Sequence, residues 1–136
     1  MSSIRLGDPA SKLLRRSAVY VWPDTTLREV AETLEREAIG LVLVRRELGV
    51  AGVVSERDLV RAIAESADLD ADRASDVMTY DIAFVEADDA IHRVADLMIE
   101  GDVRHVAVHE GAEKTGVISM RDVLPVLIGE LARARG

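Results

Sequence analysis

The stretch that decides the fold is Gly52-Val53-Val54-Ser55-Glu56-Arg57-Asp58-Leu59-Val60, which returns as Gly116-Val117-Ile118-Ser119-Met120-Arg121-Asp122-Val123-Leu124. The offset between the copies is 116 − 52 = 64 residues. It also pairs Val21 with Val85, Val30 with Val94 and Val42 with Val106. Self-similarity at a fixed period marks a supersecondary unit whose copies bury their apolar faces against each other. The chain is therefore a tandem pair.

Composition limits the classes of function. The chain has 136 residues, of which 49% are apolar and 31% charged, as in a soluble globular protein. A net charge of −8 disfavours nucleic acid and anionic membranes. The longest apolar runs, such as residues 41–44, are too short to span a bilayer, and the N-terminus has no signal-peptide pattern. The absence of cysteine excludes disulfides and thiolate catalysis. We expect a cytoplasmic protein that binds neither nucleic acid nor membranes.

The apolar periodicity predicts the order β-α-β-β-α in each copy. In the first copy we expect strands at 18–21, 41–44 and 50–54 and helices at 27–37 and 55–64. In the second we expect strands at 83–85, 104–108 and 115–119 and helices from 89 to 100 and to about 134. A short basic helix at 8–16 precedes the first copy, and 66–75 reads as a polar linker.

The start of the last helix has two interpretations. A cap at Ser119 would leave Pro125 beyond the first turn, where it kinks a helix. A cap at Asp122 would put Pro125 at the third helical position, where its missing N–H costs nothing. We favour the later start.

This duplicated unit, ending in G-h-h-S-x-R-D-h-h (h is apolar), resembles the CBS domain, named after cystathionine β-synthase. The resemblance covers residues 8 to about 134 and implies an α+β fold in which two β-α-β-β-α repeats pack as one pseudo-two-fold module. The repeats would span 8–66 and 75–134, with 67–74 as linker.

In that family, clefts between the repeats commonly bind AMP, ADP, ATP or S-adenosylmethionine. The resemblance makes Asp58 and Asp122 acceptors for ribose hydroxyls, with Ser55 and Ser119 beside them. The base would lie against residues of the first two strands: Ala18, Val19 and Val42 in copy one, and Thr79, Ile82, Ala83 and Val106 in copy two. Arg57, Arg121 and His105 are candidate phosphate contacts.

The chain departs from the family pattern in two places. Leu43 and Ala107 stand where the second strand often has proline, and the first copy begins with Leu14-Arg15 instead of Met-Thr. If one cleft is occupied, we therefore expect it to be the one that carries Asp122.

The Ser-x-x-Asp motif has a second interpretation that needs no ligand. Before an apolar helix it is close to a capping box, in which the Ser and the acidic residue satisfy each other's backbone N–H groups. Likewise, Arg57 and Arg121 could belong to a solvated face paired with nearby acids.

Metal sites and catalysis find little support. His105 and His109 share a strand face and His92 lies on a helix, but no carboxylate pattern supports a metal. The acids from Asp68 to Asp72 begin like a calcium loop, yet Arg73 replaces its required glycine. No activated nucleophile stands next to a base, so we expect no enzyme, no metal and no obligatory cofactor.

Two hypotheses remain. The first is a stand-alone regulatory module that binds an adenosine-containing ligand, forms a homodimer through its helices and signals to an unidentified protein partner. Val60, Ile63, Val126 and Leu127 are the candidate dimer surface. The second is a ligand-free structural or dimerisation domain whose Ser-x-x-Asp motifs are caps.

Overall fold

The computed structural model describes residues 3–15, 17–47, 49–80, 82–111 and 115–135. They form two compact units, which do not coincide with the sequence repeats. Unit 2 is residues 18–82, and unit 1 joins residues 1–17 to residues 83–136. Each unit holds one three-stranded sheet with its helices, so the predicted α+β class is confirmed.

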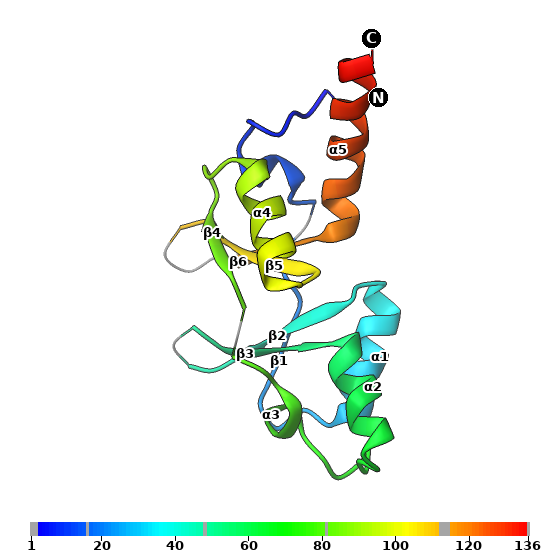
Figure 1. The fold of residues 1–136 in the computed structure, drawn as a ribbon. Coiled ribbons are helices and arrows are strands. Elements are labelled where there is room, and N and C mark those ends of the chain that lie inside the picture. Colours follow the sequence, from blue (N-terminus) through cyan, green and yellow to red (C-terminus); the bar gives the residue numbers. More distant parts are fainter. Residues whose placement is uncertain (1–2, 16, 48, 81, 112–114, 136) are drawn as a thin grey trace. The chain divides into compact units, whose positions relative to one another are not determined.

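Unit 2 is built on a sheet of order β1-β2-β3, with β1 at Tyr20–Val21, β2 at Leu41–Arg45 and β3 at Val50–Ser55. β1 and β2 are parallel, which requires a crossover, and α1 (Leu27–Glu37) supplies it. β2 and β3 form an antiparallel hairpin, followed by α2 (Glu56–Ala64). The two helices lie side by side on one sheet face (Figure 1). The hydrophobic core of unit 2 is formed by residues of these helices and of the sheet, and it contains Leu27, Val30, Leu34, Val42, Val44, Val54 and Leu59.

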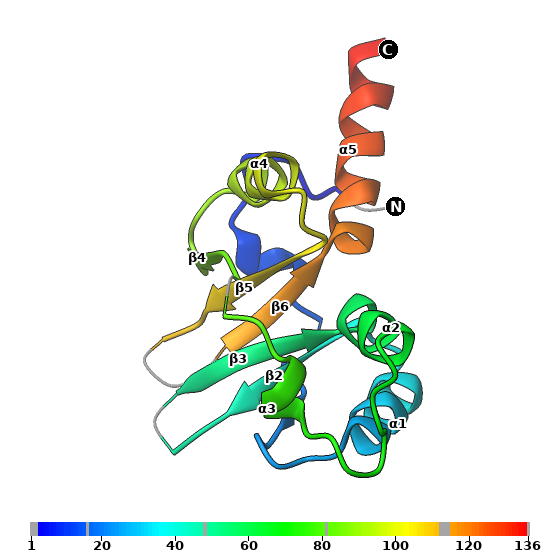
Figure 2. The ribbon, with the colours of Figure 1, turned by 60° about the horizontal axis from the view of Figure 1, so that its bottom comes forward.

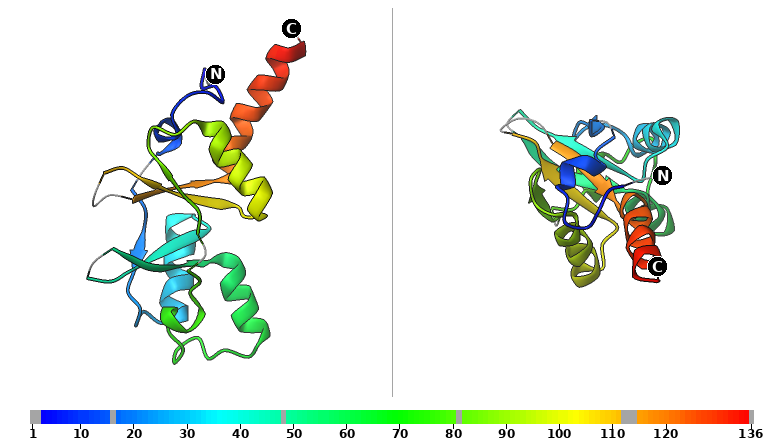
Figure 3. Two further views of the ribbon diagram at one scale, coloured as in Figure 1. Left: turned by 60° about the vertical axis from the view of Figure 1, so that its left-hand side comes forward. Right: turned by 90° about the horizontal axis from the view of Figure 1, so that it is seen from above.

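Unit 1 repeats this order with β4 (Phe84–Glu86), α4 (Ile91–Gly101), β5 (His105–His109), β6 (Thr115–Ser119) and α5 (Met120–Arg135). Figure 2 shows β4, β5 and β6 as one sheet below α4 and the base of α5. Its core also takes residues from the N-terminal 3-10 helix η1 (Ala10–Leu13). It includes Ala10, Leu13, Val85, Ile91, Val94, Val106, Ile118 and Val126. The last turns of α5 extend beyond this core (Figure 3), and residues 131–135 are exposed.

The first helix of each unit is capped by a segment from outside its own repeat. In unit 2 the backbone N–H of Leu27 donates to the carbonyl of Asp72, and that of Ala74 donates to the carbonyl of Thr25. In unit 1 the N–H of Ile91 donates to Asp8, and that of Ala10 to Asp89. All four residue pairs of this exchange obey the 64-residue offset. The exchange therefore explains why the units differ from the repeats.

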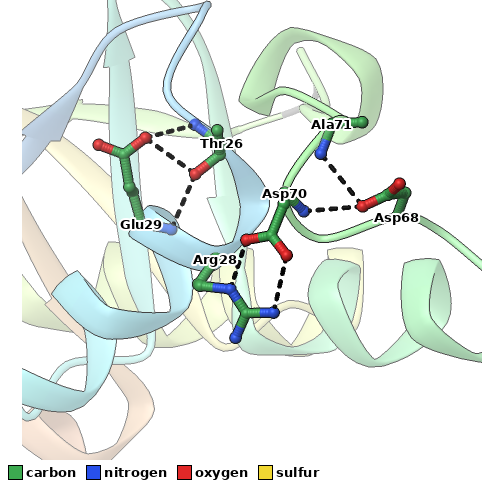
Figure 4. Close-up of polar contacts among 6 residues, drawn as sticks. All are labelled: Thr26, Arg28, Glu29, Asp68, Asp70 and Ala71. Carbon is green, nitrogen blue, oxygen red and sulfur yellow. Dashed lines mark hydrogen bonds and ion pairs between the residues drawn. The ribbon is translucent and has the colours of Figure 1, made fainter.

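The acidic segment before α3 (Ala74–Val77) is more than a linker. Asp70 accepts two hydrogen bonds from the guanidinium of Arg28, at 2.5 and 3.1 Å. Asp68 accepts from the backbone N–H groups of Asp70 and Ala71 (Figure 4). Beside them, Thr26 and Glu29 form the capping box of α1. The segment thus holds the N-terminal turn of α1 in place, a role that the interpretation of 66–75 as a polar linker did not include.

Two further expectations about helices are wrong. The last helix begins at Met120, directly after Ser119, so Pro125 lies inside it and not at its third position. The expected helix at 8–16 is reduced to η1, which ends at Leu13. Residue 16 lies outside the described residues. In the described part of the chain no helix has the length and apolarity needed to cross a membrane.

Two equivalent glycines allow a close approach of backbone segments. A Cβ atom on Gly52 would lie 2.7 Å from the carbonyl oxygen of Thr79, which pairs with Val53. A Cβ atom on Gly116 would lie 2.6 Å from a methyl carbon of Leu14. Glycine inside a strand is typical of such approaches. At Gly52 the atom that a Cβ would meet belongs to the backbone, whereas at Gly116 it belongs to the end of a side chain that can rotate.

We therefore expect Gly52→Ala to destabilise the protein by about 1–3 kcal/mol, as overpacking does. Gly116→Ala should cost less, because the Leu14 side chain can rotate away. Urea unfolding of both variants measures the difference. Gly7→Ala is the control, since a Cβ there meets nothing within 4 Å. An equal or reversed order would contradict this account of the close approach.

The ion pair of Arg28 and Asp70 predicts a pH dependence. The hydrogen bond from Arg28 lowers the pKa of Asp70 below its ordinary 3.8. A carboxyl group with a lowered pKa in the folded state stabilises that state above its ordinary pKa and loses this effect as pH falls through the folded value. Asp70→Asn should therefore lower the urea midpoint at neutral pH, and the difference from wild type should shrink below pH 3.8. A difference independent of pH would show that Asp70 acts through packing alone.

Candidate functional site

The first candidate site is the corner where β3 meets α2. Ser55 is the N-cap residue, and its hydroxyl oxygen accepts from the backbone N–H of Asp58 at 3.2 Å. Oδ2 of Asp58 accepts from the backbone N–H of Ser55 at 2.8 Å and from its hydroxyl at 3.0 Å. The motif forms a complete capping box around Asp58, which is only 9% exposed.

The corner between β6 and α5 is the equivalent site in unit 1. Oδ2 of Asp122 accepts from the backbone N–H of Ser119 at 2.8 Å and from its hydroxyl at 3.1 Å. As in unit 2, one carboxylate oxygen is engaged by the serine. A carboxylate offers about four lone-pair directions on two oxygens, so the cap leaves acceptor capacity on Oδ1.

The second oxygen distinguishes the two sites. Oδ1 of Asp58 lies 3.5 Å from a guanidinium nitrogen of Arg61, three residues later on α2. The residue at the equivalent position on α5 is Pro125. Within the described residues, no cation lies at ion-pair distance from Asp122. Our sequence interpretation missed Arg61, although its i+3 spacing from Asp58 is a visible signal.

The first helical N–H of each corner is already satisfied. Glu56 donates its backbone N–H to the carbonyl of Gly40 at 3.0 Å, and Met120 donates to that of Arg104 at 2.8 Å. These bonds fix the start of each helix against the loop before β2 or β5. Fewer N–H groups therefore remain at each helix start for a phosphate than an isolated helix would offer.

The residues expected to contact a base lie on the first two strands of each unit. Val42 and Val106 are fully buried in the two cores, so a base could reach only their backbone. The carbonyls of Val19 and Ala83 accept from Leu43 and Ala107, in equivalent positions. Ala18, Val19 and Ala83 are half-buried. These contacts stay predictions.

Thr79 and Ile82 belong to unit 2, whereas Asp122 belongs to unit 1. Thr79 exchanges two backbone hydrogen bonds of 2.9 Å with Val53, on β3. Both residues remain predictions as contacts of the second site.

The candidate phosphate contacts also differ in their surroundings. Arg57 and Arg121 are exposed on the first turns of α2 and α5. His105 is half-buried and pairs across β5 and β6 with Ser119. Directly opposite residues on antiparallel strands have side chains on the same face, about 5 Å apart at Cβ. His105 therefore stands beside the serine of the second site, where Leu41 stands beside Ser55 in the first.

The other two histidines lie apart from these corners. His109 stacks on Phe84 with ring centroids 4.5 Å apart and lies 3.6 Å from Glu86, while His92 lies 3.9 Å from Asp96. Among the residues that the structure describes, no three His, Cys, Asp or Glu side chains gather to hold a metal ion.

Comparison with known proteins shows the family to which this fold belongs. The CBS domain model matches residues 10–65 and 74–129, and the chain belongs to that family. It is a tandem CBS pair.

A solved CBS domain protein of Pyrobaculum aerophilum, complexed with AMP, is 36% identical, with a TM-score of 0.80 over 92% of this chain and 98% of that one. A CBS domain pair in complex with 5′-methylthioadenosine and S-adenosyl-L-methionine shares the fold at 17% identity, with a TM-score of 0.80 over 90% of this chain and 97% of that one. An uncharacterized 33.4 kDa protein of Thermofilum pendens is 28% identical over 91% of this chain, which spans 41% of that protein's length.

The capping geometry predicts a stability effect for both aspartates. Asp58→Ala and Asp122→Ala should each cost about 0.5–2 kcal/mol, the usual effect of losing a helix cap. The cost should be larger for Asp58, which is buried and completes a reciprocal box. Urea unfolding measures both, with Asp24→Ala as an exposed control. An unchanged midpoint for Asp58→Ala would refute its role as a cap.

Proposed function

We propose that this CBS pair is a regulatory module that binds an adenosine-containing ligand. The observation that carries the proposal is the Ser-x-x-Asp corner of unit 1, where Asp122 keeps one carboxylate oxygen without a cation partner among the described residues. A vicinal diol can donate to such an oxygen, and hydrogen bonds to a charged acceptor are the stronger kind. The AMP in the complex of the Pyrobaculum aerophilum relative supports the same ligand class.

The module would act without catalysis, through contacts with another protein. Candidate contact surfaces are exposed apolar positions on the helices, and here the structure corrects the sequence. Val60 and Ile63 on α2 are 65% and 57% exposed, but Val126 is buried and Leu127 packs against the core of unit 1. The exposed stripe of α5 consists instead of Met120, Leu124, Ile128 and Leu131. We propose a homodimer that uses such helix faces, with a further protein partner that receives the signal.

A ligand-free structural domain is the second candidate. The observation that favours it is the complete capping box of Ser55 and Asp58, which gives this motif a role in stability that needs no ligand. Both candidates share the fold, and they differ in the response to nucleotides.

A calorimetric and thermal-shift panel with AMP, ADP, ATP, NAD, S-adenosylmethionine and a cyclic dinucleotide separates them. Under the ligand hypothesis, one adenosine-containing compound binds saturably and, at a hundred times its Kd, adds about 2.7 kcal/mol of stability. Asp122→Ala should weaken that binding about tenfold or more, because a hydrogen bond to a charged group is worth about 1.5–3 kcal/mol.

Asp89→Ala is the matched control for this panel. The carboxylate of Asp89 also accepts a backbone N–H, that of Glu86 at 2.7 Å, but lies away from the Ser-x-x-Asp corner in sequence. It should lower stability and leave binding intact. If no compound in the panel shifts the wild-type protein, the structural candidate stands and the ligand proposal is rejected.

A further inference from the structure

The two Ser-x-x-Asp corners share the contact of the aspartate Oδ2 with the serine and have different charges around it. In unit 2, Oδ1 of Asp58 lies 3.5 Å from the guanidinium of Arg61. In unit 1 the residue at this position is Pro125, which has neither a charge nor a donor. A ribose diol that binds Asp58 must therefore displace a cation, whereas none of the described residues places a cation at ion-pair distance from Asp122.

The loops before β2 and β5, which lie next to the two corners, also differ in their basic residues. The backbone carbonyl that accepts from the first helical N–H belongs to Gly40 in unit 2 and to Arg104 in unit 1. The residue paired with the serine is Leu41 in unit 2 and His105 in unit 1. The second corner therefore has a guanidinium-bearing residue and a histidine in its loop, and the first has neither. In a chain with net charge −8, the guanidinium of Arg104 is a cation that Gly40 cannot supply at the first corner, and it favours an anionic group.

We propose that the two sites are inequivalent and that Arg61 makes them so. The Asp122 site takes the ligand, a 5′-phosphorylated adenosine, with its diol on Asp122 and its phosphate towards the loop of Arg104. Arg61 occupies the acceptor that the diol needs at Asp58 and lowers the affinity of that site. This inference rests on the proposed function and adds which site works, which ligand class it takes and which residue closes the other site.

The size of the effect follows from the exposure of the ion pair. The Arg61 side chain is 57% exposed and that of Asp58 10%. Exposed pairs contribute at most about a fivefold factor in an equilibrium, and the low exposure of Asp58 places this pair at the upper end. We therefore expect Arg61 to weaken diol binding at Asp58 by about fivefold.

Calorimetry with AMP tests the proposal in two directions. In wild type, Asp122→Ala should weaken binding about tenfold or more, and Asp58→Ala should change it little. In the Asp122→Ala background, Arg61→Ala should then strengthen the remaining binding about fivefold. Arg93→Ala, an exposed arginine on α4, removes the same charge away from both corners and is the control. It should leave the remaining binding unchanged.

The reciprocal exchange uses the second site. Pro125→Arg should place a guanidinium near Asp122 and weaken AMP binding about fivefold, while Pro125→Ala should not. Arg104→Gly, which introduces the residue of the first copy, should lower the preference for AMP over adenosine.

Each outcome decides between the inference and the function on which it rests. If AMP binds but is lost with Asp58→Ala and retained with Asp122→Ala, the inference is wrong and the proposed function stands. The same holds if Arg61→Ala weakens the remaining binding, since Arg61 would then contact the phosphate. If neither wild type nor any variant binds AMP, adenosine or another member of the ligand panel, both are overturned.

Discussion

The fold depends on the exchange of capping segments between the two repeats. A helix begins with backbone N–H groups that have no acceptor inside the helix, and leaving such groups buried and unpaired is costly. In this chain the carbonyl of Asp72 accepts from the start of α1, and that of Asp8 accepts from the start of α4. Each acceptor lies before the first strand of the repeat that it does not cap. Each unit is therefore completed by a segment that belongs to the other sequence repeat. Gly52 and Gly116, on the edge strands of the two sheets, leave room for these segments.

The same arrangement explains which features could be predicted from the sequence. The periodicity of apolar side chains indicates which residues of a helix are buried. For α1 the sequence also contains a recognisable capping box, Thr26 and Glu29, which marks where the helix begins. Caps made by backbone carbonyls have no side-chain signature, so the segment around Asp72 reads as a linker although it is hydrogen-bonded to α1. The buried face of α5 was predicted wrongly. Val123 and Val126 are buried at the i, i+3 spacing of one helix face, while Ile128 is exposed.

The candidate site was predictable to a similar degree. The repeat locates Ser55, Asp58, Ser119 and Asp122, and the structure explains why both interpretations of the motif seemed plausible. Oδ2 of each aspartate caps its helix, and the cap does not use Oδ1. Capping uses Oδ2, and the proposed diol would use Oδ1 of the same side chain. What the motif alone does not report is the environment of Oδ1, which is set by residue 61 in one copy and residue 125 in the other. The difference between the two sites therefore has to be found by comparing residues outside the shared motif, such as residues 61 and 125.

The separate use of the two carboxylate oxygens bears on how a ligand could regulate the protein. A ligand that binds Oδ1 of Asp122 leaves the cap on Oδ2 in place, so binding requires no unwinding of the first turn of α5. The ligand then changes contacts with another protein only to the extent that it binds two arrangements with different affinity. α5 carries both Asp122 and the exposed stripe of Leu124, Ile128 and Leu131. Pro125 lies between Asp122 and the later exposed residues Ile128 and Leu131, and it removes the N–H that would donate to the carbonyl of Arg121. The hydrogen-bond ladder of α5 is thus interrupted between the turn of Asp122 and these two exposed residues, and a change in helix angle there would move them without disturbing the cap.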